Sequence, residues 1–256
     1  MKKEKYLTLA FSIGGIIFLL LLWEISSKVY ASPLIFPGPI AVFESFLNLV
    51  ITPRFYTALW NSFLRVLGSI VIAIPLGIIA GIAAGLDKRT AAFLKPLFSV
   101  ISATPVISVI LIAFLLFGSG NTPVFTALLM IFPVLSANVI EGIQSTDNKK
   151  KELFTSFRMS PFEFIRYLYL PSLLPFILGA IRSSLSLCWK VVVAAEVIVQ
   201  PLRSLGTGMQ TARAQLESPD LFAWTAATVL AASLSQALFS IIIKLWLNPN
   251  GKIKIK

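Results

Sequence analysis

Long apolar runs separated by short polar segments dominate this sequence. Six runs of roughly 18–25 residues are each long enough for a helix, at about 1.5 Å per residue, to cross a hydrocarbon core of ~30 Å. They cover residues 6–23, 63–86, 97–117, 123–143, 176–199 and 221–247. Backbone groups inside a bilayer must bond within their own segment, so helices are expected. The pattern predicts an all-α polytopic membrane protein with about six transmembrane helices, folded as a single domain over residues 1–256.

Two segments between the runs are long. Residues 24–62 contain three prolines followed by an apolar stretch at 40–50, which predicts a short helix lying at the outer membrane interface, with a simple linker as the alternative. Residues 144–175 form the second long segment, between the fourth and fifth runs.

Basic residues set the predicted orientation. With the N-terminus placed inside, the inner segments carry fifteen Lys and Arg and the outer segments five. The inner ones are Lys2, Lys3, Lys5, Lys88, Arg89, Lys95, Lys149, Lys150, Lys151, Arg158, Arg166, Lys244, Lys252, Lys254 and Lys256; the outer ones are Lys28, Arg54, Arg65, Arg203 and Arg213. This asymmetry predicts both termini in the cytoplasm of a bacterial-type inner membrane and an uncleaved first helix.

Composition removes several classes of function. Hydrophobic residues make up 57% of the chain and charged ones 13%, and the net charge of +11 flanks the apolar runs instead of forming a nucleic-acid patch. Histidine is absent and the one cysteine, Cys188, lies in an apolar run, so neither a histidine-based site nor a disulfide framework is expected. We expect no metal and no cofactor. There is no phosphate-binding G-x-x-x-x-G-K-[ST] motif, so any ATPase must be another chain.

The inner segment 144–175 is patterned like a folded docking element. Ser160 suits a helix N-cap, Pro161 the first helical position, and Glu163 the third, where its side chain reaches back to the Ser160 N–H. Pro171 predicts that this helix ends near Leu170. Its aromatic side chains give this helix more apolar surface than a solvated loop needs, which indicates a protein partner.

The same segment resembles the EAA loop of ATP-binding cassette importer permeases. Glu152 matches the glutamate of that motif, and Leu170-Pro171 match its ending. Leu153 and Phe154 replace the two alanines and Arg158 replaces the usual glycine, which puts the packing of the loop in doubt. Further resemblances lie at 34–39, 61–66, Ala194-Ala195-Glu196 and Ser204-Leu205-Gly206, and they extend over most of the chain. Together they resemble the subfamily that imports nitrate, sulfonates such as taurine, or pyrimidine precursors of thiamine.

The resemblance implies partners and a mechanism. Two permease subunits, expected as a homodimer, enclose a path for a small anionic or polar solute. A cytoplasmic ATP-binding subunit grips the EAA loop of each, and an extracytoplasmic binding protein delivers the solute. The chain itself would then be a transport subunit and not an enzyme.

Charges within the fifth run predict which residues line that path. At 100° per residue, Arg182, Ser183, Ser186, Lys190 and Glu196 fall within an arc of about 140°. A charge at the bilayer centre costs about 2.5–3.5 kcal/mol, so this stripe is expected to line a path or to pair with groups on other helices, with snorkelling of Arg182 to the inner face as the alternative. Glu196, near the outer end, has the alternative role of holding its helix in place.

Two further alternatives remain open from the sequence. Gly77, Gly81 and Gly85 lie on one helix face and favour close helix packing, within one subunit or between two. The rival function is a secondary transporter or channel that works without an ATPase.

Overall fold

The chain folds into helices only, over the residues that the structure describes. The computed structural model describes residues 2–30, 32, 34–147, 152, 156–157 and 160–247. In chain order the elements are α1 (Lys2–Tyr30), α2 (Pro39–Val50), α3 (Pro53–Leu86), α4 (Lys88–Ala103), α5 (Val106–Gln144), α7 (Pro161–Glu163), the π-helical turn η1 (Phe164–Tyr169), α8 (Leu170–Val199), α9 (Leu205–Ala214) and α10 (Ser218–Leu247). The predicted all-α class is confirmed.

Five of these helices are long and apolar enough to cross a membrane. They are Ala10–Tyr30, Pro53–Leu86, Val106–Gln144, Arg166–Val199 and Ser218–Leu245. They contain all of the second, fourth and fifth predicted runs, and the first and sixth apart from a few terminal residues. A short helix, α2, occupies the apolar stretch predicted to be helical before the second run.

The third predicted run, 97–117, is not one helix, so that prediction is wrong. α4 ends at Ala103, and Thr104 has an extended backbone (φ −74°, ψ 127°) because Pro105 follows it. The chain then restarts as α5 and bends again at Gly118, whose φ of 69° lies in the region that favours glycine. A sixth crossing would therefore consist of α4 and residues 106–117 joined by a break.

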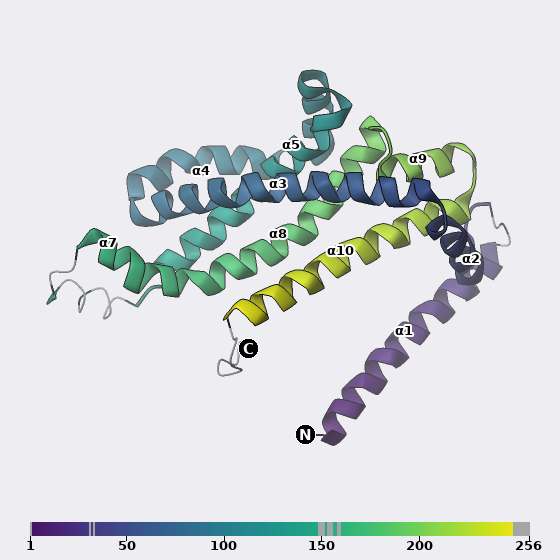
Figure 1. Cartoon of the computed structure of the whole chain (residues 1–256), viewed down its shortest axis with the longest axis horizontal. Helices are drawn as coiled ribbons and strands as arrows, with labels where there is room; N and C mark the ends of the chain where they lie inside the picture. Colours follow the sequence, from purple (N-terminus) through teal and green to yellow (C-terminus); the bar gives the residue numbers. More distant parts are fainter. Residues whose placement is uncertain are drawn as a thin grey trace.

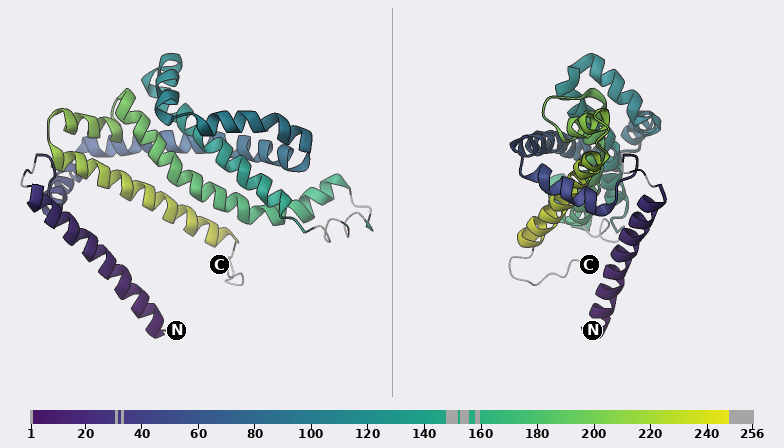
Figure 2. Two further views of the ribbon diagram at one scale, coloured as in Figure 1. Left: turned by 180° about the vertical axis from the view of Figure 1, so that it is seen from behind. Right: turned by 90° about the vertical axis from the view of Figure 1, so that its right-hand side faces the viewer.

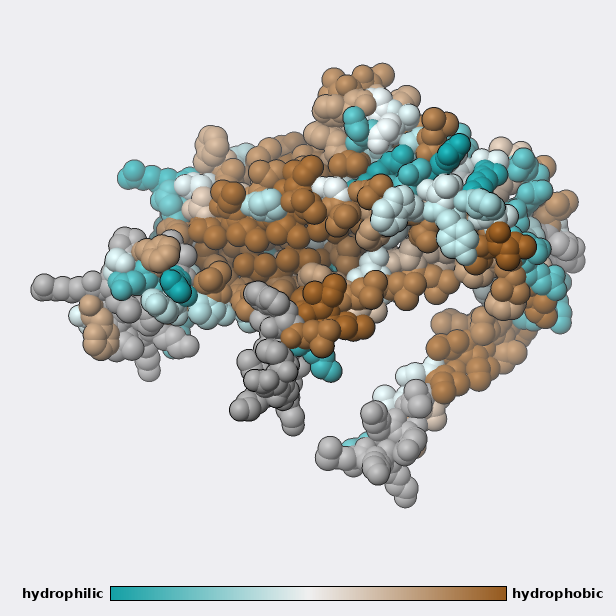
Figure 3. All heavy atoms as spheres, viewed as in Figure 1, coloured by the Kyte–Doolittle hydropathy of each residue, from teal (hydrophilic) through white to brown (hydrophobic). Residues whose placement is uncertain are grey.

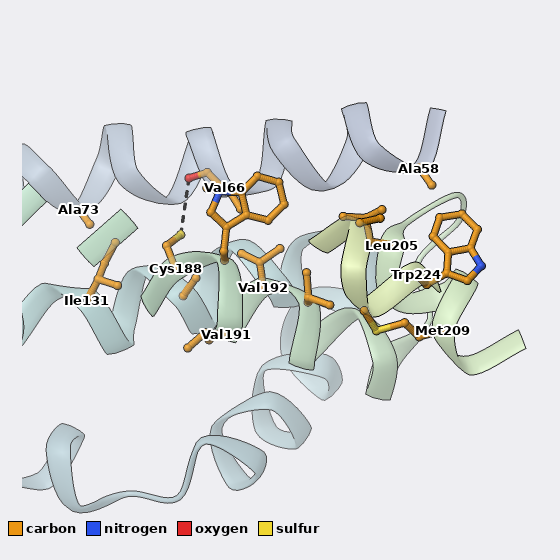
Figure 4. Packing of buried hydrophobic residues seen from close by; sticks show 14 of the residues in the cluster. Ala58, Val66, Ala73, Ile131, Cys188, Val191, Val192, Leu205, Met209 and Trp224 are labelled. Atoms are coloured by element: carbon orange, nitrogen blue, oxygen red, sulfur yellow. Dashed lines mark hydrogen bonds between the residues drawn. The ribbon is translucent and has the colours of Figure 1, made fainter. Parts of the chain in front are cut away.

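The core of the bundle lies where α3 and α8 pack along α5. Val66 and Ala73 of α3 point toward Cys188 of α8 and Ile131 of α5, and the Cys188 Sγ lies 3.7 Å from the Val66 carbonyl oxygen (Figure 4). Farther along α3, the three glycines predicted to favour close packing lie against α5.

Those glycines leave room for three aliphatic side chains of α5. A Cβ atom at Gly77 would lie 2.5 Å from the Leu135 Cβ, and one at Gly81 would lie 2.6 Å from the Val139 Cβ. At Gly85 the Ile143 Cδ1 would be 2.7 Å away. These distances are shorter than van der Waals contact, so the two helix backbones approach too closely for any larger residue.

α1 diverges from the rest of the bundle (Figures 1 and 2). It joins the bundle near its C-terminal end, where Trp23 Nε1 donates a hydrogen bond of 3.0 Å to the Pro37 carbonyl and the Trp23 ring stacks on Phe222 of α10. Its apolar side chains are exposed along its length. Such a helix is stable where lipid or another protein covers its apolar side chains, and it is unfavourable in water.

Apolar side chains cover the middle of the bundle on the face seen in Figure 3, and polar ones gather at its two ends, near α7 and near α9. An apolar band between two polar ends is the surface that a bilayer requires. The ends of the bundle thus mark the two membrane interfaces.

Candidate functional site

The docking element predicted at 144–175 is described in part. Leu153, Phe154 and Arg158 lie outside the described residues. Glu152 is exposed and helical, and its carbonyl accepts a hydrogen bond of 2.9 Å from the Ser156 hydroxyl.

The capping box at the start of α7 is formed as expected. The Ser160 N–H donates to Glu163 Oε2 at 2.7 Å, and the Glu163 N–H donates to the Ser160 hydroxyl at 3.3 Å. Pro161 is the first helical residue, where its missing N–H leaves no bond unmade. The backbone hydrogen bond from Ser160 lowers the pKa of the Glu163 carboxyl below its ordinary value.

The helix that begins at Pro161 does not end near Leu170, so that prediction is wrong. The backbone stays helical through the π-turn η1 and into α8, with Pro171 at the start of α8. A proline removes one backbone donor and its ring crowds the preceding turn. The wider π-helical turn just before Pro171 gives the ring room, so the chain passes the proline without breaking.

This end of the molecule exposes large apolar side chains around the start of the long span Arg166–Val199. Phe157, Phe162, Tyr167 and Leu170 all have more than half of their surface exposed. The Arg166 guanidinium lies 5.7 Å from the centre of the Tyr167 ring. An apolar patch rimmed by charge at the tip of a bundle is typical of a protein interface.

A second candidate surface runs along α8. Arg182, Ser183 and Lys190 are exposed and Ser186 is half-buried, so the chain leaves four of the five predicted stripe residues uncovered. Gly179 and Ala194 are exposed on the same side. We call these six residues the polar face of α8; the opposite side, with Ala180, Cys188 and Val192, is buried in the core.

Both cations of the polar face lack a counter-ion within the described part of the chain: neither Arg182 nor Lys190 has an ion pair there. The ion pairs found are Lys28–Glu24 and Arg65–Glu196. Glu196, the acidic residue of α8, is paired with Arg65 of α3 instead.

Glu196, the fifth stripe residue, is fully buried and turned toward α3 and α9. Its Oε1 accepts a bond of 2.8 Å from Arg65 Nη1, and its two oxygens accept bonds of 2.9 Å and 2.8 Å from the Ser62 hydroxyl. Oε2 also accepts the Gly206 N–H at 3.2 Å, while the Leu205 N–H donates to Ser62 Oγ at 3.0 Å. This geometry favours the helix-holding role that the sequence left open for Glu196.

The partners of Glu196 are not apparent from the sequence. Arg65 reads there as an outer basic residue, and Ser62 only as part of a family segment. One signal was available: an acid and a base, each in an otherwise apolar run, are costly unless they pair. The sequence did not say which runs pack together, so it did not identify the pair.

With this geometry described, comparison with known proteins gives a consistent result. A family model described as "binding-protein-dependent transport system inner membrane component" matches residues 73–249. The taurine transport system permease protein TauC of Escherichia coli (strain K12) is 29% identical over 230 residues, covering 87% of this chain and 83% of that protein. The bicarbonate transport system permease protein CmpB of Synechococcus elongatus is 27% identical over 207 residues, covering 76% of this chain and 73% of that protein.

Solved structures agree on the fold. The chain superposes on one from the crystal structure of an amino acid ABC transporter with histidines, with a TM-score of 0.62 at 18% identity, covering 78% of this chain and 96% of that one. At this identity the likeness is one of fold.

Proposed function

Because the chain belongs to the family of binding-protein-dependent transport system inner membrane components, we propose that it forms the path for a small oxyanion in an ATP-driven importer. A separate cytoplasmic subunit hydrolyses the ATP, and an extracytoplasmic binding protein supplies the solute. The chain spans the bacterial inner membrane several times, with both termini in the cytoplasm.

The observation that carries the solute class is the pair of uncompensated cations on α8. Arg182 and Lys190 are exposed in the middle of a span, where lipid contact would cost each about 2.5–3.5 kcal/mol. They must therefore face water, another subunit or a charged solute. The relatives named for taurine and bicarbonate carry solutes with anionic oxygen atoms, which suit two cations beside two serine hydroxyls. Pyrimidine precursors, implied by the sequence resemblance, lack that match.

A second copy of the chain completes the path. The polar face of α8 is exposed in a single chain. When two copies place these faces against each other, both faces are removed from contact with lipid. Symmetric pairing through one self-complementary surface is the commonest form of homo-oligomer.

The exposed apolar end around Phe162 supports the ATPase partner. It includes Phe157, Tyr167 and Leu170, and it lies on the side that the basic residues place in the cytoplasm. We assign Glu152, Leu153, Phe154, Arg158 and the segment from Ser160 to Pro171 to this contact, as the family resemblance implies.

The test is uptake of labelled taurine into proteoliposomes that contain this chain with the ATPase and binding protein of its own gene cluster. We expect uptake that requires ATP. Lys190→Gln should slow it about tenfold, since one lost charge-assisted contact of about 1.4 kcal/mol changes binding by that factor. The matched control is Lys244→Gln. Lys244 lies near the end of α10, and this variant should transport normally.

Two results would contradict the proposal. Uptake without nucleotide or partner chains would make the protein a secondary transporter or channel. Uptake that is equal for Lys190→Gln and Lys244→Gln would remove the polar face of α8 from the path.

A further inference from the structure

A shallow cavity of about 390 Å³, widely open to its surroundings, lies between α4 and α5, away from the residues discussed so far. It is lined by Ala91, Lys95, Phe98, Ser99 and Ser102 of α4 and by Ile140 of α5. Its size falls within the range of small-molecule sites, which are mostly apolar with a few convergent polar groups. Nothing in the proposed transport path uses these residues.

The polar groups of this cavity come from one side of α4. Lys95, Ser99 and Ser102 are spaced four and three residues apart, which places them above one another on the helix. Two buried serines elsewhere in the bundle are bonded to their own helix: Ser69 donates to the Arg65 carbonyl and Ser136 to the Phe132 carbonyl.

Ser99 and Ser102 differ from those serines. Neither hydroxyl has a hydrogen-bond partner within the described residues, and the Lys95 ammonium has no ion pair there. Lys95, Ser99 and Ser102 are all exposed and line the same open cavity, so two hydroxyls and one ammonium have no partner in the described part of the chain and are accessible to a ligand. The group they suit is an acceptor with several oxygen atoms and a negative charge.

No acid neutralises this cavity. The sequence from Lys88 to Ile140 contains neither Asp nor Glu. Glu141 follows Ile140 directly but lies about 100° farther round α5, and it makes no ion pair with Lys95 within the described residues. The cavity thus keeps a net positive charge.

We propose that this cavity is an oxyanion-binding site in which Lys95 is the counter-ion and the Ser99 and Ser102 hydroxyls are donors. Its occupant carries a sulfonate, carboxylate or phosphate group, either on the transported solute near its release or on a lipid headgroup. The solute source rests on the proposed function, whereas the site itself does not.

The test measures protection of a cysteine at the rim of the cavity. The full chain carrying Ser102→Cys is placed in phosphatidylcholine nanodiscs, without ATPase or binding protein, and labelled with a neutral thiol reagent; native Cys188 is fully buried. Methanesulfonate is the solute-like probe, and nanodiscs containing phosphatidylglycerol supply the headgroup. A bound anion should slow labelling by 1 + [L]/Kd, about tenfold at ten times Kd.

Matched variants decide the outcome. Protection by either probe that survives Lys95→Arg and disappears in Lys95→Gln supports the site, and the probe that protects identifies the source. The control Phe93→Cys, on the outward side of α4, should label equally under all conditions. Equal labelling of Ser102→Cys with and without both probes, or protection that persists in Lys95→Gln, overturns the proposal. Because no transport is measured, this result is independent of the uptake test.

Discussion

Glu196 and Arg65 show at the scale of single residues how a charge is accommodated inside this bundle. Glu196 is fully buried, and the Arg65 side chain is only 15% exposed. The carboxylate accepts bonds from Ser62 and Arg65 of α3 and from the Gly206 N–H at the start of α9, where the helix dipole also favours a negative charge. The pair thereby ties α3, α8 and α9 at one end of the molecule.

Removing one member of this pair should cost more stability than removing both. We expect Glu196→Gln to lower the free energy of unfolding by about 3–5 kcal/mol, because a buried guanidinium is left unpaired. Arg65→Gln should have a similar effect. The double variant should recover part of the loss, as measured by denaturant unfolding in detergent. Strictly additive losses would mean that the two groups do not interact.

At the scale of elements, the close approach of α3 and α5 depends on the absence of a Cβ atom. At Gly81 a methyl group would meet the Val139 Cβ at 2.6 Å and the Ser136 carbonyl oxygen at 2.9 Å. Backbone atoms cannot yield as a flexible side chain can, so the helices would have to separate.

Gly81→Ala should therefore destabilise the bundle by about 1–3 kcal/mol, the usual cost of overpacking. Gly68→Ala on the same helix is the matched control, because its nearest neighbour, the Val124 Cγ1, is 4.0 Å away. There the replacement should be neutral or stabilising by up to about 1 kcal/mol, since alanine is the better helix former. Thermal unfolding of the two variants side by side measures the difference, and equal shifts would argue against the close packing of α3 on α5.

The start of α7 should respond to pH through Glu163. Its pKa is lowered in the folded chain by the Ser160 hydrogen bond, so the carboxylate stabilises the capping box above the ordinary carboxyl pKa. This stabilisation is lost as the pH falls through the lowered value. The Ser160 amide resonance of labelled protein in nanodiscs should follow that titration. Glu163→Gln, which keeps the cap without a charge, should abolish it, and a titration that persists in this variant would implicate another group.

At the scale of the whole molecule, one chain leaves two kinds of surface uncovered. The apolar band seen in Figure 3 is satisfied by lipid, but the polar face of α8 is not. A chain that spans a membrane with this face open is incomplete, which is the physical basis for the proposed pair of copies.

Cross-linking between copies tests that pairing. Gly179 lies on the polar face and has nothing within 4 Å of a Cβ placed there, so Gly179→Cys should be tolerated. Under mild oxidation in membranes it should form a covalent dimer. Ile79→Cys, on an exposed apolar surface of α3, should stay monomeric. Dimers from Ile79→Cys alone would place the contact on another surface.

The sequence by itself determined the features that depend on local chemistry. Apolar runs longer than a bilayer is thick produced the long helices, and Ser160, Pro161 and Glu163 produced the capping box, because each effect acts over a few neighbouring residues. Tertiary structure decided the rest. It set the partners of Glu196 on α3, which lie more than a hundred positions away in the chain, the continuous helix through Pro171 and the open cavity that Lys95, Ser99 and Ser102 line with Ile140. The first and the last of these depend on which helix faces pack together, and such contacts leave no periodic signal in a single sequence.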